Sequence, residues 1–192
     1  MKIHNITDKM VQGQPKIEEV LPKLLKLVGS YPIVGHGVGF DINLIVNAAK
    51  RSGVPCFIKR NPVIDTLRMA RFYGESTTNS LEHLRQHFNI TSEGAHRAMS
   101  DVVVNIEVFK QLGKEYRTKE QLMKRLSRPI ALKWWPFGKY KGRSFNDIPL
   151  EYLRWAVTKD FDEDLTYSIK LELKRRKKGN LFSQATNPFA DL

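Results

Sequence analysis

The 192-residue sequence contains a single cysteine, Cys56, and has no apolar run approaching the roughly 18–20 residues that a membrane-spanning helix needs. One cysteine excludes an intramolecular disulfide and a cysteine-rich zinc site, and a reducing cytoplasm is the simplest compartment. Because Cys56 lies in the apolar stretch 54–58, we interpret it as a structural residue. Residues 1–14 are polar and mixed, without the apolar core of a signal peptide. We therefore expect a cytoplasmic protein with no membrane partner.

Acidic residues are few compared with basic ones. The chain has 32 Lys and Arg against 20 Asp and Glu, which gives a formal net charge of +12 and a pI of about 9.8. Residues 1–130 carry 20 basic and 12 acidic side chains, and residues 131–192 carry 12 and 8, so the excess is spread along the chain. A positive field of this size favours phosphate-bearing partners, although charge alone does not identify a nucleic-acid-binding protein.

The order of apolar runs, glycines and prolines predicts an α/β domain followed by a small, mainly helical domain. Short apolar runs at 31–34 and 62–65 predict strands, and a helical pattern follows each of them. We expect domain boundaries as follows: an α/β domain over 1–116, a charged linker over 117–130, a small basic domain over 131–179 and a disordered tail over 180–192.

Three side chains of the first domain are candidates for chemistry. Asp41 follows a predicted strand and a glycine-rich turn, which is a frequent position for catalytic groups in α/β sheets. The same position also suits a helix cap. His96 and Asp101 are five residues apart, so on one helix their side chains would diverge by about 140°. They can converge only if His96 lies in the loop before the helix. Each signal alone is compatible with a structural role.

The combination of these segments is more specific. Residues 35–53, GHGVGFDINLIVNAAKRSG, resemble the second motif of the DEDDh exonucleases, the class of the DNA polymerase III epsilon subunit. Residues 96–101, HRAMSD, resemble the third motif. Residues 62–71 and 79–90 resemble the connecting segments of the family in order and spacing. The resemblance extends over about residues 1–115.

This resemblance implies a ribonuclease H-like fold and 3′→5′ exonuclease activity by two-metal-ion phosphodiester hydrolysis, with Mg²⁺ or Mn²⁺ as the ions. Carried over by position, Asp41 and Asp101 would be metal-binding carboxylates, and His96 would be the general base that deprotonates the attacking water. Phe40 would support the site by packing, and both Phe40 and His36 are candidates for contact with nucleic acid. The implied partners are DNA with a single-stranded 3′ end and a DNA polymerase.

Two features depart from the family pattern. Asparagine usually follows the second-motif histidine, whereas here Gly37 follows His36. The first motif, an Asp-x-Glu pair on the first strand, does not occur in this sequence. We therefore expect the fold to lack its N-terminal strands, the metal site to have half of its carboxylates, and the apolar faces of the first two helices to lack their main packing partner. A truncated sequence explains this pattern better than a naturally inactive domain.

The C-terminal part contains the run PFGKYKG at 136–142, which resembles a small bacterial domain of unknown function that is sometimes attached to exonucleases of this class. Lys139, Lys141 and Arg143 lie close in sequence to several aromatic residues. Such a mixture can bind a single strand, because cations contact phosphates and aromatic faces stack on bases. The alternative is that the aromatic residues form the core of a small domain and the lysines are only solvated.

Two main hypotheses about function follow from the sequence. The first is a 3′→5′ exonuclease similar to the DNA polymerase III epsilon subunit. The second is a catalytically inactive module that binds nucleic acid or a polymerase, because the first carboxylate pair is absent. A scaffold that only presents the C-terminal domain is the third alternative.

Overall fold

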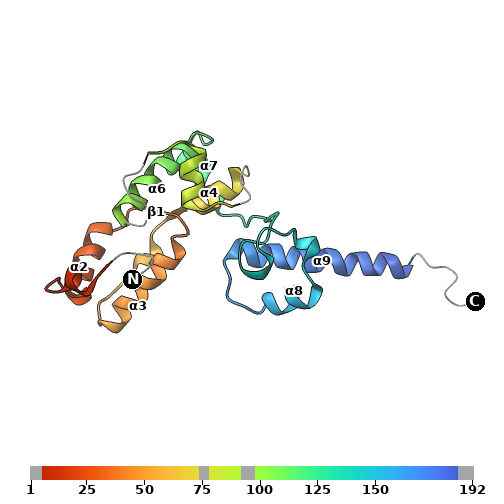
Figure 1. Cartoon of the computed structure of the whole chain (residues 1–192), viewed down its shortest axis with the longest axis horizontal. Helices are drawn as coiled ribbons and strands as arrows, with labels where there is room; N and C mark the ends of the chain where they lie inside the picture. The colour runs from red at the N-terminus through yellow and green to blue at the C-terminus, as the bar shows by residue number, and fades with distance from the viewer. Residues whose placement is uncertain (1–5, 74–77, 92–97, 186–192) are drawn as a thin grey trace, which may run out of the picture. The chain divides into compact units, whose positions relative to one another are not determined.

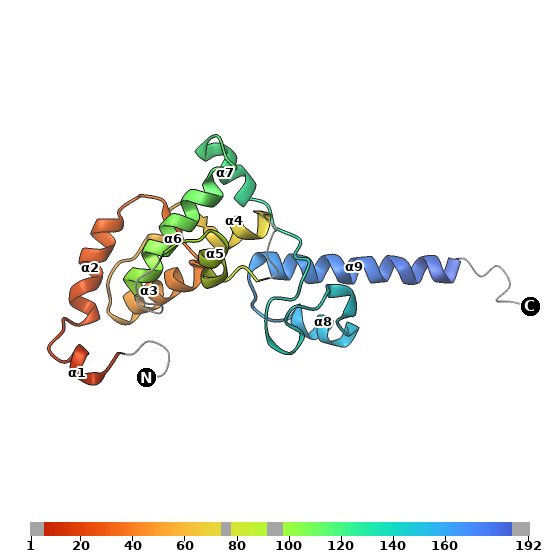
Figure 2. The same cartoon turned by 45° about the horizontal axis from the view of Figure 1, so that its top comes forward.

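A computed structural model of the chain describes residues 6–73, 78–91 and 98–185, with the backbone alone for 179–185 (Figures 1 and 2). Internal contacts divide the chain into two compact units. Unit 1 comprises Met1–Tyr73 and Asn79–Leu126, and unit 2 comprises Gly74–Thr78 and Ser127–Leu192. In the described residues, no helix is long and apolar enough to cross a membrane.

Unit 1 is a mixed α/β structure. Its elements follow the order α1 (Asp8–Val11), α2 (Ile17–Val28), β1 (Ile33–Gly35), α3 (Gly39–Arg51), η1 (Ile58–Arg60), β2 (Val63–Asp65), α4 (Thr66–Tyr73), α5 (Leu81–His87), α6 (Ala98–Gly113) and α7 (Lys119–Leu126). Both predicted strands are present. The hydroxyl of Ser80 accepts a hydrogen bond from the backbone N–H of His83 and thereby caps the N-terminus of α5.

The two strands are parallel neighbours, and the crossover between them contains α3. Their register pairs Ile33 with Val63, Val34 with Ile64, and Gly35 with Asp65. Since the carboxyl ends of parallel strands meet at one edge of a sheet, the turn that follows Gly35 and the residues that follow Asp65 lie next to each other. This edge is where the candidate active site forms.

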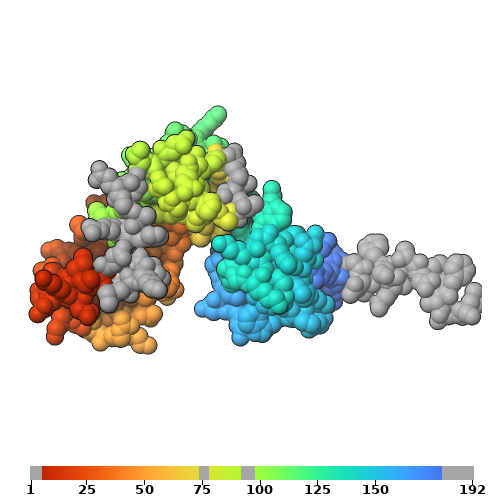
Figure 3. Space-filling view, in the orientation of Figure 1, coloured from red at the N-terminus to blue at the C-terminus, as the bar shows by residue number. Residues whose placement is uncertain are grey.

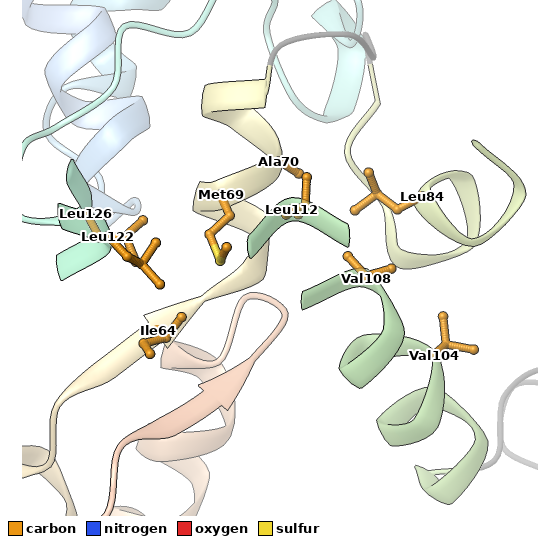
Figure 4. Close-up of a cluster of buried hydrophobic side chains, with 9 residues drawn as sticks. All are labelled: Ile64, Met69, Ala70, Leu84, Val104, Val108, Leu112, Leu122 and Leu126. Carbon is orange, nitrogen blue, oxygen red and sulfur yellow. The ribbon is translucent and has the colours of Figure 1, made fainter. Parts of the chain in front are cut away.

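The largest core of unit 1 lies between β2 and four helices, α4, α5, α6 and α7 (Figure 4). Helix α6 presents Val104, Val108 and Leu112 to this core at helical spacing, while Met69 and Ala70 enter it from α4. Figure 4 shows these side chains pointing toward one another from elements that are distant in sequence. The packing fixes α6, and therefore Asp101 in its first turn, relative to the sheet.

Helix α7 corrects the expected linker over 117–130. It occupies Lys119–Leu126, and its Leu122 and Leu126 are buried in the core of unit 1. The guanidinium of Arg68 on α4 also donates a hydrogen bond to the carbonyl of Leu126. The charged sequence suggested a linker because only one face of this short helix is apolar, and that face is buried.

Helices α2 and α3 pack on each other, so part of each apolar face has a partner that was not predicted from the sequence. Leu21 of α2 is buried against Ala48 and Ala49 of α3, and Cys56 packs against this cluster as a structural residue. Much apolar surface nevertheless stays exposed in unit 1. The exposed side chains include, on α2, β1, α3 and α6, Ile17, Val20, Leu27, Val34, Phe40, Leu44, Met99, Val102, Val103 and Ile106.

Unit 2 is mainly helical, with η2 (Gly138–Tyr140), η3 (Phe145–Asp147), α8 (Leu150–Ala156) and α9 (Glu163–Ala185). Its core contains Trp135, Phe145, Ile148, Leu153, Ala156, Leu165 and Ile169. The backbone continues as helix to Ala185, so the first part of the tail that we expected to be disordered is helical. The rest of that segment, 186–192, lies outside the described residues.

One buried carboxylate and two arginines of α9 stabilise the segment around η3 in unit 2. Glu172, whose side chain is 7% exposed, forms ion pairs with Arg175 and Arg176. The Arg176 guanidinium also donates to the carbonyls of Phe145, Asn146 and Ile148. Hydrogen bonds from Arg175, followed by those from Arg176, keep the pKa of the Glu172 carboxyl below its usual value despite burial. The Arg176 side chain thereby provides a hydrogen-bond donor to three carbonyls in and directly after η3.

Candidate active site

The turn between β1 and α3 requires glycine at two positions. A Cβ at Gly35 would lie 2.6 Å from Cγ2 of Val38, a buried side chain, so only glycine fits there. Gly37 has φ of +67°, which is in the left-handed region that favours glycine. The tight turn places Asp41 in the first turn of α3, where its carboxylate is exposed. The positive end of the helix dipole favours a negative charge at this position.

Phe40 differs from its expected role in packing. Its side chain is 70% exposed, so it does not support the site from within the protein. An exposed ring next to Asp41 is instead available to a ligand, and contact with nucleic acid stays a prediction for Phe40.

A network of hydrogen bonds centred on Thr66 joins the two segments that carry the candidate carboxylates. Thr66, which is fully buried, donates to Oδ1 of Asn105 at 2.6 Å and lies 3.2 Å from the carbonyl oxygen of Gly35. Gly35 ends the strand before Asp41, and Asn105 lies four residues after Asp101 on α6. One hydroxyl group therefore connects the turn before α3 to the N-terminal part of α6.

His36 belongs to the same network. Its Nδ1 lies 3.1 Å from the Thr66 hydroxyl, and its Nε2 lies 2.9 Å from the carbonyl oxygen of Asn79. A carbonyl only accepts hydrogen bonds, so Nε2 carries the hydrogen and Nδ1 of the neutral ring is an acceptor, which shares the single hydrogen of the Thr66 hydroxyl with Asn105 and Gly35. Through these contacts His36 helps to fix the turn between β1 and α3. A direct contact of His36 with nucleic acid stays a prediction.

Asp65 has a structural role that the sequence analysis did not assign. Its Oδ1 accepts hydrogen bonds from the backbone N–H groups of Gly37 and Leu67, both at 2.9 Å. The carboxylate thus holds the glycine turn on one side and the start of α4 on the other. Asp65 and Thr66 fall within the segment PVIDTLRMAR, but sequence spacing does not show which turn they contact.

The environment of His36 gives a pH-dependent contribution to stability. Burial lowers the pKa of its imidazole below the usual 6.5, and Arg71 acts in the same direction, whereas Asp65 and the hydrogen bond to Asn79 oppose the shift. The unfolded chain therefore binds the proton more readily than the folded chain. This contribution is fully present above pH 6.5 and is lost as the pH falls toward the lower, folded-state pKa.

We expect unit 1 to lose unfolding free energy on acidification, and the substitution His36→Gln to reduce that loss because glutamine does not titrate. Chemical denaturation, with amide hydrogen exchange in peptides of unit 1 as the probe, gives the free energy of unfolding at about pH 7.5 and about pH 5.5. The decrease between the two pH values is then compared for the wild type and the variant. An equal decrease in the wild type and the variant would show that His36 does not cause the pH dependence.

Asp101 lies in the first turn of α6, and its side chain is exposed. Like Asp41, it has no hydrogen-bond or ion-pair partner among the described residues. His96, the predicted general base, lies outside those residues, so its geometry relative to Asp101 is not described. Two exposed carboxylates at helix N-termini, close to a shared network, are the part of the predicted site that the structure describes.

The two carboxylates agree with a metal site in chemistry but do not complete one. Exposed carboxylate oxygens are suitable ligands for Mg²⁺ or Mn²⁺. No group of three or more His, Cys, Asp or Glu side chains that could hold a metal ion occurs within the described part of the chain. Further ligands would have to come from residues outside it, from water or from the substrate.

The three basic candidates of the C-terminal part lie in unit 2. The ammonium of Lys139 lies 5.5 Å from the centre of the Tyr140 ring, and the guanidinium of Arg143 lies 5.8 Å from it. Lys141 is exposed and follows Tyr140 in sequence. Trp155 and Lys159 were not among the predicted residues, and the Lys159 ammonium lies 5.1 Å from the centre of the Trp155 ring. The two residues are four positions apart, as neighbours on one helix face are, but Lys159 lies beyond the end of α8, so helical spacing alone does not establish the contact.

Comparisons with known proteins show which proteins this chain is similar to. A family model described as "Exonuclease" matches residues 1–109. A second model, whose name refers to a quorum-sensing-regulated virulence factor, matches residues 120–173. The DNA polymerase III epsilon subunit of Aquifex aeolicus is 38% identical over 109 residues, which are 56% of this chain and 53% of that protein.

Two further relatives are similar over comparable stretches. A PolC-type DNA polymerase III of Clostridium perfringens is 36% identical over 110 residues, which are 57% of this chain and 7% of that protein. Exonuclease X, solved in complex with 5′-overhanging duplex DNA, is 25% identical over 65% of this chain and 70% of that one, with a TM-score of 0.49. The chain thus spans about half of the epsilon subunit and a small part of the PolC-type polymerase.

Proteins of the matched exonuclease family generally use divalent metal ions. The mixed α/β unit with a small parallel sheet, followed by a mainly helical unit, agrees with the predicted ribonuclease H-like exonuclease class. The exonuclease model matches more than half of the residues, including both segments that carry Asp41 and Asp101. The chain therefore belongs to the exonuclease family.

Proposed function

We propose that the protein carrying this chain is a 3′→5′ exonuclease that hydrolyses nucleic acid, with a single-stranded 3′ end of DNA as its substrate. The observation that carries the proposal is the Thr66 network, which joins the turn before Asp41 to the helix that bears Asp101. Two exposed carboxylates are thereby held at helix N-termini within one unit of a chain that belongs to the exonuclease family.

Each candidate residue has a distinct proposed part. Asp41 and Asp101 would hold Mg²⁺ or Mn²⁺, because both carboxylates are exposed and have no partner among the described side chains. Two such ions, when bound, polarise the scissile phosphate and activate the attacking water. His96 would take the proton of that water. The exposed ring of Phe40, next to Asp41, would contact the terminal base, and His36 would keep the turn in position through Thr66.

The proposed partners are DNA and a DNA polymerase. One relative is a DNA polymerase III epsilon subunit and another is a PolC-type DNA polymerase III, which supports recruitment of this chain to a polymerase. The net charge of +12 supports a nucleic-acid substrate, since the positive field attracts phosphates. A cytoplasmic place of action is part of the same proposal and agrees with the single cysteine.

The test is a polarity assay on a single-stranded oligonucleotide that carries a label at either end. With Mn²⁺ or Mg²⁺ present, we expect the 5′-labelled strand to give a ladder of progressively shorter products and the 3′-labelled strand to release its label as a mononucleotide first. A chelator in excess should stop both reactions, because the carboxylates need the ions to act on phosphate. Shortening from the 5′ end, or cleavage that is unaffected by the chelator, would contradict the proposal.

A second candidate function rests on a specific observation. The described residues bring no three metal-binding side chains together, so the chain could bind nucleic acid without cutting it. Binding of the labelled strand without any product, with either ion, would favour this non-cutting module. The same assay therefore separates the two hypotheses.

A further inference from the structure

Three aromatic rings form a row on unit 2, from η2 to helix α8. The ring centres of Tyr140 and Tyr152 are 4.7 Å apart, and those of Tyr152 and Trp155 are 5.1 Å apart. Tyr152 and Trp155 lie three residues apart on α8, so their side chains share one face of the helix. We call Tyr140, Tyr152 and Trp155 the aromatic row.

The aromatic row leads from the core to the surface. Tyr152 lies 5.5 Å from Trp135, the buried ring at the centre of the core of unit 2. Trp155, by contrast, is 49% exposed and does not belong to the core cluster. Tyr140 and Tyr152 pack against the core, so stability accounts in part for an aromatic residue at these two positions. Packing against the core does not account for a tryptophan at position 155. A large exposed aromatic side chain on a small unit is a candidate for contact with a ligand.

Cationic side chains lie near both ends of the aromatic row. The Lys159 ammonium lies 5.1 Å from the Trp155 ring, and Lys139 and Arg143 lie 5.5 and 5.8 Å from the Tyr140 ring. The nearest acidic residue on α8, Glu151, is paired with Arg154 at 2.9 Å. Asp160 follows Lys159 in sequence and is exposed.

The charge of residues 127–192, the larger segment of unit 2, points to an anionic ligand. Residues 127–192 carry 13 Lys and Arg against 8 Asp and Glu, a net charge of +5. The segments that hold the row and its cations adjoin on the surface of unit 2 (Figure 3). An acidic protein would match the charge alone, whereas the exposed Trp155 ring beside Lys159 also matches the flat faces of unpaired bases.

We propose that the aromatic row is a stacking site for single-stranded nucleic acid. A base stacks on the half-exposed ring of Trp155, and the neighbouring phosphates contact Lys159 at one end of the row and Lys139 and Arg143 at the other. Single strands are selected because the bases of a duplex are already stacked on each other and their faces are not available. The site differs from the earlier sequence-based choice in that Trp155 and Lys159, rather than Lys141, are central.

This inference goes beyond the proposed exonuclease function, because unit 2 can bind a strand whether or not unit 1 cuts it. The experiment therefore measures equilibrium binding in the presence of a chelator, using the full 192-residue chain and a fluorescein-labelled oligothymidylate of about 12 nucleotides. Loss of cleavage in the polarity assay leaves this result untouched, so the two proposals fail independently.

Fluorescence anisotropy should show that Trp155→Ala weakens binding about 5- to 150-fold, and that Trp155→Phe retains most of the affinity because phenylalanine also stacks. The matched aromatic control is Tyr167→Ala, which removes a ring on α9 that is 39% exposed. The control should bind like the wild type. An unchanged thermal midpoint of Trp155→Ala would exclude unfolding as the cause, and Trp155→Phe and Lys159→Ala supply the answer if that variant does not fold.

The salt dependence tests the cations. Lys159→Ala should reduce the slope of log affinity against log salt concentration by about 0.7, the value for one phosphate contact on a single strand. Lys170→Ala changes the net charge equally on α9 and should leave the slope unchanged. Equal slopes for the two variants, unchanged affinity of Trp155→Ala, or equally strong competition by a blunt duplex would each overturn the proposal. Displacement of the oligonucleotide by polyglutamate at equal charge would overturn it in favour of an acidic peptide.

Discussion

Replacing Asp101 with asparagine is expected to reduce the rate of 3′-end cleavage at least about 100-fold, equivalent to about 2.7 kcal/mol of activation free energy. Asparagine keeps the size of the side chain but removes the negative charge that a divalent ion requires. The carboxylate is exposed and has no partner among the described residues, so its removal disturbs no described hydrogen bond or ion pair. The same argument predicts an equal loss for Asp41→Asn.

Turnover of the end-labelled strand measures this loss, and Asp8→Asn is the matched control. Asp8 is also an exposed carboxylate in the first turn of a helix of unit 1, but it lies outside both motif segments. We expect the control to cleave at the wild-type rate. A second readout is the thermal midpoint with and without Mn²⁺, which should rise in the wild type and rise less in both motif variants. Full activity of either variant would refute its role as a metal ligand.

The substitution Thr66→Val is expected to lower the free energy of unfolding of unit 1 by about 1–3 kcal/mol, the cost of leaving buried polar groups without partners. Valine has nearly the shape of threonine but lacks the hydroxyl, so the Asn105 side chain loses its 2.6 Å hydrogen bond. The Gly35 carbonyl and the Nδ1 atom of His36 lose their contacts with the same hydroxyl. Thr66→Ser keeps the hydroxyl and should lose clearly less stability.

Cleavage should fall as well, by about 10- to 100-fold, because small misplacements of positioned groups cost rate without removing any catalytic group. The three tryptophans all lie in unit 2, so their fluorescence reports on that unit and hydrogen exchange is needed for unit 1. A double-mutant cycle with Asn105→Ala tests the connection, and a coupling energy above about 0.5 kcal/mol is expected for direct partners. Additive effects of the two substitutions would show that Thr66 and Asn105 act separately.

These two predictions separate carboxylates that act on the substrate from the buried groups that position them. Asp41 and Asp101 are exposed and have no hydrogen-bond or ion-pair partner among the described residues, whereas Thr66 and Asn105 are buried and hydrogen-bonded to each other. A nuclease needs both classes, because the ions tolerate little change in the distance between their ligands. A module that only binds nucleic acid would show the stability effect of Thr66→Val without any effect on cleavage.

Much of the fold was accessible from local patterns in the sequence. The strands at 33–35 and 63–65 and the helix capped by Ser80 follow from apolar periodicity and capping chemistry, which act over a few residues. The α7 helix was missed because its apolar face is short and its other positions are charged, so only burial against β2 and α4 reveals it. The mutual packing of α2 and α3 was missed for the same reason, since it depends on a contact between distant segments.

The sequence by itself determined the family and predicted Asp41, His96 and Asp101 as site residues, because residue types at fixed spacing are a property of the chain alone. Only the tertiary structure decided that Asp65 and Thr66 hold the glycine turn, since these contacts span about 30 positions of the chain. It also decided that Trp155 lies outside the core while Trp135 fills it. Both are tryptophans in an aromatic-rich segment, and burial depends on which neighbours the folded chain brings to each of them.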